Sequence, residues 1–248
     1  MRSIIAVTYL FLFLIFSLPV MLIALIVGLF SIKARDLMML RFVQFGLYTV
    51  YRFIVGVKVT VNGLENIPED EAVLFIGNHT SYFDIITTYP IMKRPTGFVA
   101  KKEIKKIPIL PWVMHFVRCL FLDRENPRAG LQTILKAAEY IQDGISIVIF
   151  PEGTRSKDGT LGEFKEGSFK IATKAKCPVV PMGIIGTPDV FEKHTPWMKP
   201  AKVTINFGKP VSTAEMSRPE MKALPSMIRE EVARLSGQES HSENTSEE

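Results

Sequence analysis

The chain divides into a uniformly apolar beginning and a longer body in which short apolar runs alternate with polar segments. Residues 4–30 contain no charged side chain, and a helix of this length exceeds the roughly 20 residues that cross a bilayer. Pro19 removes one helical hydrogen bond near the middle of the run. The pattern predicts an N-terminal membrane anchor over residues 1–35. Two geometries are open: a single tilted or kinked span, or a helical hairpin that enters one leaflet and returns.

The charges around this run bear on its orientation. Lys33, Arg35 and Arg41 follow it closely, against Arg2 and the amino terminus before it. Cytoplasmic flanks of membrane segments are rich in Lys and Arg, so for a single span this bias favours a cytoplasmic body. For a hairpin both ends are cytoplasmic, and the bias decides little. A signal peptide is the competing interpretation. The run is longer than the roughly 7–15 residues of a signal core, however, and no small-x-small cleavage site precedes Lys33.

Residues 36–56 mix polar and aromatic side chains instead of continuing the apolar run. The polar members recur at helical spacing, at Arg41, Gln44, Tyr48 and Arg52. This spacing predicts an amphipathic helix. It either covers the body of the protein or lies in the headgroup layer of a membrane, with its arginines and aromatic rings at the interface.

Seven segments of the body are predicted to be strands. Residues 58–63 alternate like a strand, and short apolar runs occupy residues 72–76, 97–100, 119–122, 145–150, 178–186 and 201–208. Helices are expected between and after them, over residues 85–92, 128–143, 168–176 and 218–235. The alternation predicts an α/β domain over residues 57–236 with a mixed, largely parallel sheet. Residues 237–248 are polar and carry four glutamates, so we expect a disordered acidic tail.

Candidate chemistry begins directly after the run at residues 72–76. His79 follows that predicted strand, and Asp84 stands five positions later. An imidazole has an unperturbed pKa of about 6.5, which suits proton transfer, and a carboxylate on its second nitrogen would fix the tautomer. Five positions on one helix do not share a face, so His79 must lie in a turn and Asp84 in the helix beyond it, with Thr80 or Ser81 as the cap.

A second loop follows the run at residues 145–150. Gly153 permits close backbone approach, while Thr154 and Arg155 supply donors suited to a phosphate. Because α/β proteins place ligands at the carboxyl ends of their strands, this loop and the His79 turn can meet at one sheet edge.

Together the two loops carry a family pattern. Residues 78–84 read Asn-His-x4-Asp, and residues 150–156 read Phe-Pro-Glu-Gly-Thr-Arg-Ser. In this order, each behind a strand-like run, they resemble the 1-acylglycerol-3-phosphate acyltransferase family, over roughly residues 57–210. The resemblance implies a glycerol-3-phosphate acyltransferase-like fold for the domain. It also implies transfer of a fatty acyl group from a thioester to the sn-2 hydroxyl of lysophosphatidate, forming phosphatidate.

The resemblance carries site roles onto individual residues. It makes His79 the general base and Asp84 its orienting carboxylate. It places the acceptor phosphate on Lys101, Arg124, Gly153, Thr154 and Arg155. Residues expected to shape the loops are Asn78, Pro151 and Glu152. The chain departs from the family where Pro111 replaces a usual glycine and where Cys119 stands at a frequent glycine. Backbone amides near residues 78–81 are the nearest candidates for oxyanion donors.

Several lysines have two open interpretations. Those at residues 101–106 are either a solvated face or an attraction for an anionic substrate. Lys157 and Lys165, together with the basic helix at 168–176, are either solvated or near anionic headgroups.

Other chemistries lack their motifs. The four histidines have no metal-ligand spacing, and the sequence contains no nucleotide-binding glycine loop and no Gly-x-Ser-x-Gly elbow. We therefore expect no metal, no cofactor and no acyl-serine, with acyl-CoA or acyl carrier protein supplying the donor thioester. The formal charge of +5 comes without a nucleic-acid motif, so the expected partners are a lysophospholipid, the thioester donor and a bilayer. Two other functions stay open: an acyltransferase for another lysolipid, and a non-catalytic lipid-binding protein.

Overall fold

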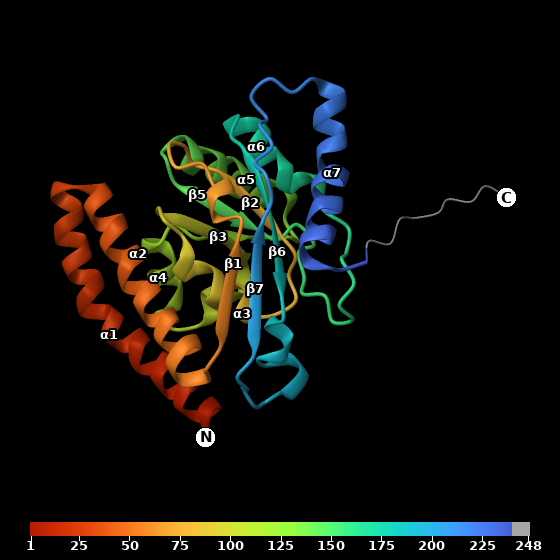
Figure 1. Cartoon of the computed structure of the whole chain (residues 1–248). Helices are drawn as coiled ribbons and strands as arrows, with labels where there is room; N and C mark the ends of the chain where they lie inside the picture. The colour runs from red at the N-terminus through yellow and green to blue at the C-terminus, as the bar shows by residue number, and fades with distance from the viewer. Residues whose placement is uncertain (240–248) are drawn as a thin grey trace.

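The computed structural model describes residues 1–239 and builds one mixed β-sheet with helices on both faces (Figure 1). Within these residues the sheet has seven strands in the order β1-β7-β6-β2-β5-β3-β4, and the β6–β7 pairing alone is antiparallel. The strands are β1 Lys58–Asn62, β2 Leu74–Gly77, β3 Thr96–Lys101, β4 Leu120–Leu122, β5 Ser146–Ile149, β6 Val179–Ile185 and β7 Lys202–Phe207. The predicted mixed, largely parallel sheet is confirmed.

Alternate residues of the central strands enter two separate cores. In β2, Leu74 and Ile76 pack into one core, whereas Phe75 packs into the other. The first core is covered by helices α5 Pro127–Gln142, α6 Lys170–Ala175 and α7 Arg218–Ser236. The second is covered by α2 Ile32–Tyr48, its π-helical continuation Thr49–Val55, α3 Phe83–Thr88 and α4 Leu110–Phe116. Burial on both faces explains why β2, β5 and β6 read as continuous apolar runs.

Helix α4 is absent from the sequence-based prediction. Leu110–Phe116 has seven residues and carries Pro111 in its first turn. A helix of two turns gives too little periodicity to recognise, and proline suggested a turn, although the first helical turn tolerates it.

The N-terminal segment forms a helical hairpin whose turn lies where the sequence did not indicate it. Helix α1, Arg2–Phe30, continues through Pro19, and the chain breaks at Ser31, where the backbone is extended (φ −155°) and the side chain accepts a hydrogen bond from Ala34 N–H. The turn therefore falls at Ser31 and not within the apolar run. One lost hydrogen bond at Pro19 leaves the rest of the helical ladder intact.

The two helices lie side by side (Figure 1) and pack closely at a glycine of the second helix. The Phe13 ring stacks on Phe42, with ring centroids 4.6 Å apart. The Phe13 ring occupies the space that a side chain at position 46 would need, because a methyl group on Gly46 would come within 2.4 Å of the ring atoms. The hairpin also joins the body, because the Ser3 hydroxyl accepts from Met198 N–H at 2.7 Å and Asp36 of α2 pairs with Arg118 at 2.7 Å.

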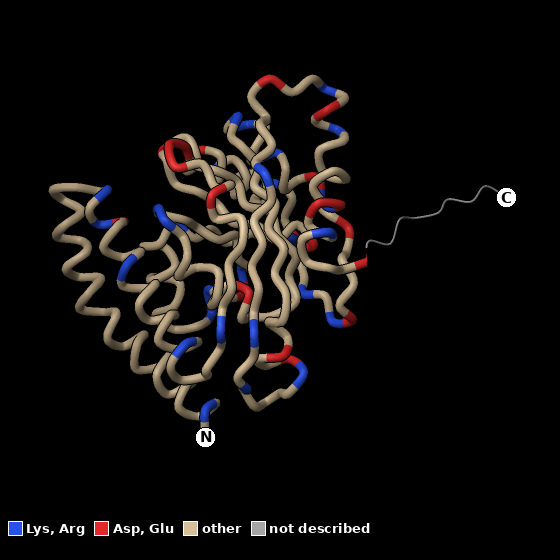
Figure 2. The backbone as a smooth tube through the Cα atoms, in the orientation of Figure 1, with Lys and Arg blue, Asp and Glu red and all other residues tan. Residues whose placement is uncertain are grey.

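Helix α1 is long and apolar enough to cross a membrane, and it is the one such helix among residues 1–239. Only 17% of its most apolar 18-residue stretch is buried, whereas the core helix of a soluble protein is mostly buried. Figure 2 shows both charge signs spread over the body and almost no charge along α1. The exposed apolar surface continues past the hairpin turn at Phe45 and Phe53, 68% and 72% exposed.

The acidic tail predicted for residues 237–248 is described only at its start. Gly237 ends α7 in the left-handed conformation, and Gln238 N–H donates to the Ala233 carbonyl. Residues 240–248 lie outside the described part of the chain, so disorder in the tail stays a prediction.

Candidate active site

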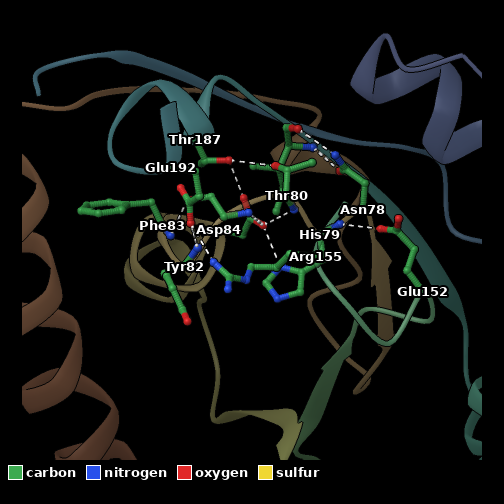
Figure 3. Close-up of polar contacts among 12 residues, drawn as sticks. Asn78, His79, Thr80, Tyr82, Phe83, Asp84, Glu152, Arg155, Thr187 and Glu192 are labelled. Carbon is green, nitrogen blue, oxygen red and sulfur yellow. Dashed lines mark hydrogen bonds and ion pairs between the residues drawn. The ribbon is translucent and has the colours of Figure 1, made fainter. Parts of the chain in front are cut away.

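The histidine and aspartate that follow β2 face one another across a turn (Figure 3). His79 Nδ1 lies 2.8 Å from Asp84 Oδ2. His79 sits in the turn and Asp84 in the first turn of α3, as the spacing required. The Ser81 hydroxyl accepts from Phe83 N–H at 2.9 Å, but the N-cap position of α3 is Tyr82, which makes no side-chain capping bond, so the cap expected at Thr80 or Ser81 is not found there.

Asp84 is fully buried and holds its position through a shell of donors. Its Oδ2 also accepts from the N–H groups of Thr80 and Ser81, each at 2.8 Å, while the Thr187 hydroxyl donates to Oδ1. Because an ionised carboxylate only accepts hydrogen bonds, Nδ1 of His79 is the protonated nitrogen and Nε2 is the basic one.

The other edge of His79 is available for chemistry. Its ring stacks on Phe150 at 4.4 Å with an interplanar angle of 11°, and its side chain is 17% exposed. Among the described residues, Nε2 has no hydrogen-bond partner. The arrangement leaves a basic nitrogen in a fixed direction at the carboxyl edge of the sheet.

The loop after β5 binds both backbone groups of His79. His79 N–H donates to Glu152 Oε1 at 2.7 Å, and Ser156 N–H donates to the His79 carbonyl at 2.8 Å. Glu152 Oε2 accepts from Gly162 N–H at 3.0 Å. Burial raises the pKa of Glu152, and the backbone donors from His79 and Gly162 oppose that rise. Glu152 therefore joins three backbone segments and faces no reacting group.

Asn78 and Pro151 also act on backbone. The Asn78 side-chain amide donates to the Ile184 carbonyl at 2.9 Å and accepts from Ile184 N–H at 2.8 Å, which ties the His79 turn to β6. The buried Pro151 accepts from Lys165 N–H at 3.1 Å through its carbonyl.

The expected oxyanion donors are not available. The N–H groups of His79, Thr80 and Ser81 are directed at Glu152 and Asp84. The turn uses these amides to hold its own carboxylates, so the expectation for residues 79–81 is wrong.

Arg155 is already paired. Its Nη1 lies 3.1 Å from Glu192 Oε1, and its guanidinium lies over the Tyr82 ring at 3.7 Å (Figure 3). Glu192 also accepts from the Ser81 hydroxyl at 2.6 Å and from Tyr82 N–H at 2.9 Å. The predicted phosphate ligand is thus held by a carboxylate from a distant segment. Thr154 is exposed beside it.

The remaining predicted phosphate ligands separate into two places. A methyl group at Gly153 would lie 3.5 Å from Arg124 Cζ and 3.2 Å from Lys165 Nζ, so both cations lie over this glycine. Lys101 ends β3 with an exposed side chain opposite Leu122 of β4, and its side chain makes no hydrogen bond or ion pair within residues 1–239. The structure therefore brings Arg124 and Gly153 together and adds Lys165.

Sequence reasoning missed Thr187 and Glu192. Both follow β6, which runs parallel to β2 and ends at the same edge. The rule that carboxyl ends of parallel strands converge could have found them, had it been applied to this third strand.

Comparisons with known proteins identify the family of the domain that carries these residues. An acyltransferase family model matches residues 58–185, from the start of β1 to the end of β6. A chloroplast 1-acyl-sn-glycerol-3-phosphate acyltransferase of Brassica napus is 40% identical over 131 residues, or 52% of this chain and 38% of that protein. A 1-acyl-sn-glycerol-3-phosphate acyltransferase of Borreliella burgdorferi is 30% identical over 182 residues, or 73% of each chain.

The fold has a solved counterpart. The crystal structure of the 1-acyl-sn-glycerophosphate acyltransferase PlsC from Thermotoga maritima matches with a TM-score of 0.70 and 28% identity, covering 97% of this chain and 100% of that one. The match confirms the expected fold, and it includes the N-terminal hairpin in the aligned length. The matched stretch spans well under half of the Brassica relative. On the family model and the Borreliella relative, the chain belongs to the acyltransferase family.

Proposed function

We propose that this protein is a membrane-associated acyltransferase that moves a fatty acyl group from a thioester to the sn-2 hydroxyl of lysophosphatidate, forming phosphatidate. The observation that carries the proposal is the His79–Asp84 pair, with Nε2 unpartnered among the described residues at the carboxyl edge of the sheet. The relatives named for this reaction support the choice of acceptor.

The dyad suits direct transfer. His79 Nε2 takes the hydroxyl proton as the acceptor oxygen bonds to the thioester carbonyl carbon. The tetrahedral intermediate then collapses, the carbon–sulfur bond breaks, and the leaving thiolate takes the proton from the imidazolium. Asp84 steadies the imidazolium between the two steps. A thiol of pKa about 8.5 leaves readily, so little acid assistance is needed.

The cysteines do not offer a covalent route. Cys119 and Cys177 are both buried, and burial raises the pKa of each thiol to about 12. A thiolate is the nucleophilic form of cysteine, and it is scarce at neutral pH in such a site.

The helical hairpin supplies the membrane attachment in this proposal. Its exposed apolar surface extends along α1 and onto Phe45 of α2 and Phe53 of the π-helical continuation. Both acyl chains of the reaction partition into lipid, so an enzyme at the interface need not extract its acceptor. In a hairpin both ends lie on one side of the membrane, and we propose that this is the cytoplasmic side; the basic residues at the hairpin turn do not decide it.

The attachment is testable with vesicles. The full-length protein is expected to sediment with them and to stay bound in 1 M salt, where the Debye length is about 3 Å. Release by salt alone would mean that surface charge, and not the hairpin, holds the protein to the membrane.

The reaction is tested with purified protein, a panel of lysolipid acceptors, and acyl-CoA and acyl carrier protein as donors. Phosphatidate should form from lysophosphatidate with at least one donor and disappear in His79→Ala. Transfer to a different lysolipid only would replace the proposed acceptor. Binding of lysophosphatidate without transfer under any condition would favour a non-catalytic lipid-binding protein.

A further inference from the structure

The carboxylate that holds the backbone of His79 is itself held at its second oxygen. Glu152 Oε1 accepts from His79 N–H at 2.7 Å, a bond drawn in Figure 3, and Oε2 accepts from Gly162 N–H at 3.0 Å. Glu152 and Gly162 both lie in the stretch between β5 and the helical turn Glu166–Phe169, which belongs to no helix or strand of the fold. The position of Glu152 therefore depends on what fixes Gly162.

Arg229 of α7 binds this stretch from outside it. Its Nε donates to the Gly162 carbonyl at 3.0 Å, and its Nη2 donates to the Leu161 carbonyl at 3.0 Å. A guanidinium presents its donors in a rigid planar fork, which suits two successive carbonyls. Its positive charge also makes these hydrogen bonds stronger than bonds from a neutral donor.

A single peptide unit joins Arg229 to Glu152. The Leu161 carbonyl and the Gly162 N–H belong to the same planar peptide group, so the carbonyl that accepts from Arg229 is conjugated with the N–H that donates to Glu152. Hydrogen bonds in series polarise one another. The guanidinium therefore fixes the direction of this N–H and strengthens its bond to the carboxylate.

Helix α7 is a firm support for the arginine. Leu224, Ile228 and Val232 are buried in the core on its inner face, and the loop places Leu161 and Phe164 in the same core. The end of the helix adds a second contact, because the Gln238 side-chain amide donates to the Gly159 carbonyl at 2.6 Å. The last helix of the chain thus holds the loop through both packing and hydrogen bonds.

The same loop reaches both backbone groups of His79. In addition to the Glu152 contact, Ser156 N–H donates to the His79 carbonyl at 2.8 Å. A general base acts only within hydrogen-bond distance of the proton that it removes, and a displacement of about 1 Å costs up to about 100-fold in rate. A shift of this loop would therefore slow proton removal without any change in the base itself.

We propose that Arg229 is a positioning residue for the catalytic base, acting on His79 through the Leu161–Gly162 peptide and Glu152. The proposal rests on the proposed function and extends the active site to α7, which lies outside the residues 58–185 that the family model matches.

The test compares Arg229→Met with Arg234→Met. Arg234 lies on the same helix and pairs with Glu231 one turn earlier, so it is the matched control for loss of an arginine from α7. Arg229→Met should lower kcat about tenfold, because His79 is displaced, while the KM for lysophosphatidate and for the thioester stay within about twofold. Arg234→Met should match wild type. Arg229→Lys, which can donate to one of the two carbonyls, should recover part of the lost rate.

Double variants show whether Arg229 acts through Glu152. Combined with Glu152→Gln, Arg229→Met should add little to the loss in kcat, because both changes interrupt the same series of bonds. Combined with Thr187→Val, which acts on Asp84 instead, the two losses should multiply.

Hydrogen exchange tests the contact without any substrate. In Arg229→Met, the amide protons of His79 and Gly162 should exchange at least about tenfold faster than in wild type. The amide protons of Thr80 and Ser81, which are bound to Asp84, should exchange at the wild-type rate and serve as the internal reference.

Three results would overturn the assignment. Unchanged exchange at His79 and Gly162 would mean that Arg229 does not hold the loop. Faster exchange with an unchanged kcat would mean that the loop does not position the base. A loss in kcat that multiplies with that of Glu152→Gln, or that follows the loss of folded protein, would leave Arg229 a structural residue of α7. If wild type fails to acylate lysophosphatidate, the proposed function falls, while hydrogen exchange still decides whether Arg229 holds the His79 amide.

Discussion

Two loops at the same edge of the sheet differ in how far along the chain their key side-chain contacts reach. In the His79 turn, the contact that matters for chemistry joins His79 to Asp84, five residues apart. In the loop after β5, contacts come from Arg124, Lys165 and Glu192, which belong to other segments. A motif whose contacts are local can be understood from its sequence, whereas the partners of a motif with distant contacts depend on the fold.

The largest expected effect comes from removing the base. His79→Ala should lower kcat about 10³-fold, within the range for general acid–base catalysis, and leave the protein folded because the side chain stabilises no core. Steady-state rates and circular dichroism on the same preparation check both statements. Activity within a few-fold of wild type would rule out His79 as the general base.

Asp84→Asn tests whether the local contact sets the tautomer. The amide can donate to Nδ1 and leave the proton on Nε2, so kcat should fall by about 10²-fold or more. It also faces the Thr80 and Ser81 N–H groups, so the melting temperature should drop. A variant that is destabilised but fully active would reduce Asp84 to a structural residue.

Arg155 and Glu192 test the distant contacts. If they act as one clamp on the catalytic turn, each alanine variant should lower kcat/KM about tenfold, and the double variant should do little more. The coupling energy should be about 1–2 kcal/mol. Strictly additive losses would mean that Arg155 contacts the substrate independently of Glu192, as the sequence alone suggested.

Thr187→Val gives the smallest effect and measures how far the distant shell supports the local pair. It removes one donor to Asp84 Oδ1 while the turn's own amides remain. We expect a stability loss of about 1 kcal/mol and a fall in kcat of several-fold, checked by denaturant titration and rates. Thr187→Ser, which keeps the hydroxyl, should restore most of the activity. A fall in kcat as large as that of Asp84→Asn would mean that the position of Asp84 depends mainly on Thr187 and not on the amides of the turn.

The N-terminal hairpin also makes contacts that its sequence did not predict. From the sequence alone, a deletion of residues 1–30 would be expected to leave the catalytic domain folded, because every predicted strand begins after them. In the structure, Ala6, Met21 and Ala24 of α1 are buried in the core that also receives Phe75. The deletion should therefore lower stability as well as membrane attachment.

By itself the sequence determined the seven strands, the mixed sheet and the His79–Asp84 pair. Apolar runs and a five-residue spacing report local geometry, which depends on neighbours along the chain. Only the tertiary structure showed that Glu192 and Thr187 contact the residues of the His79 turn and Arg155, that Lys165 lies over Gly153, and that the hairpin turns at Ser31 instead of Pro19. A charged side chain on a loop looks solvated until the fold shows what faces it. Whether Arg155 meets a carboxylate or a phosphate depends on the meeting of strand ends that lie far apart in the chain.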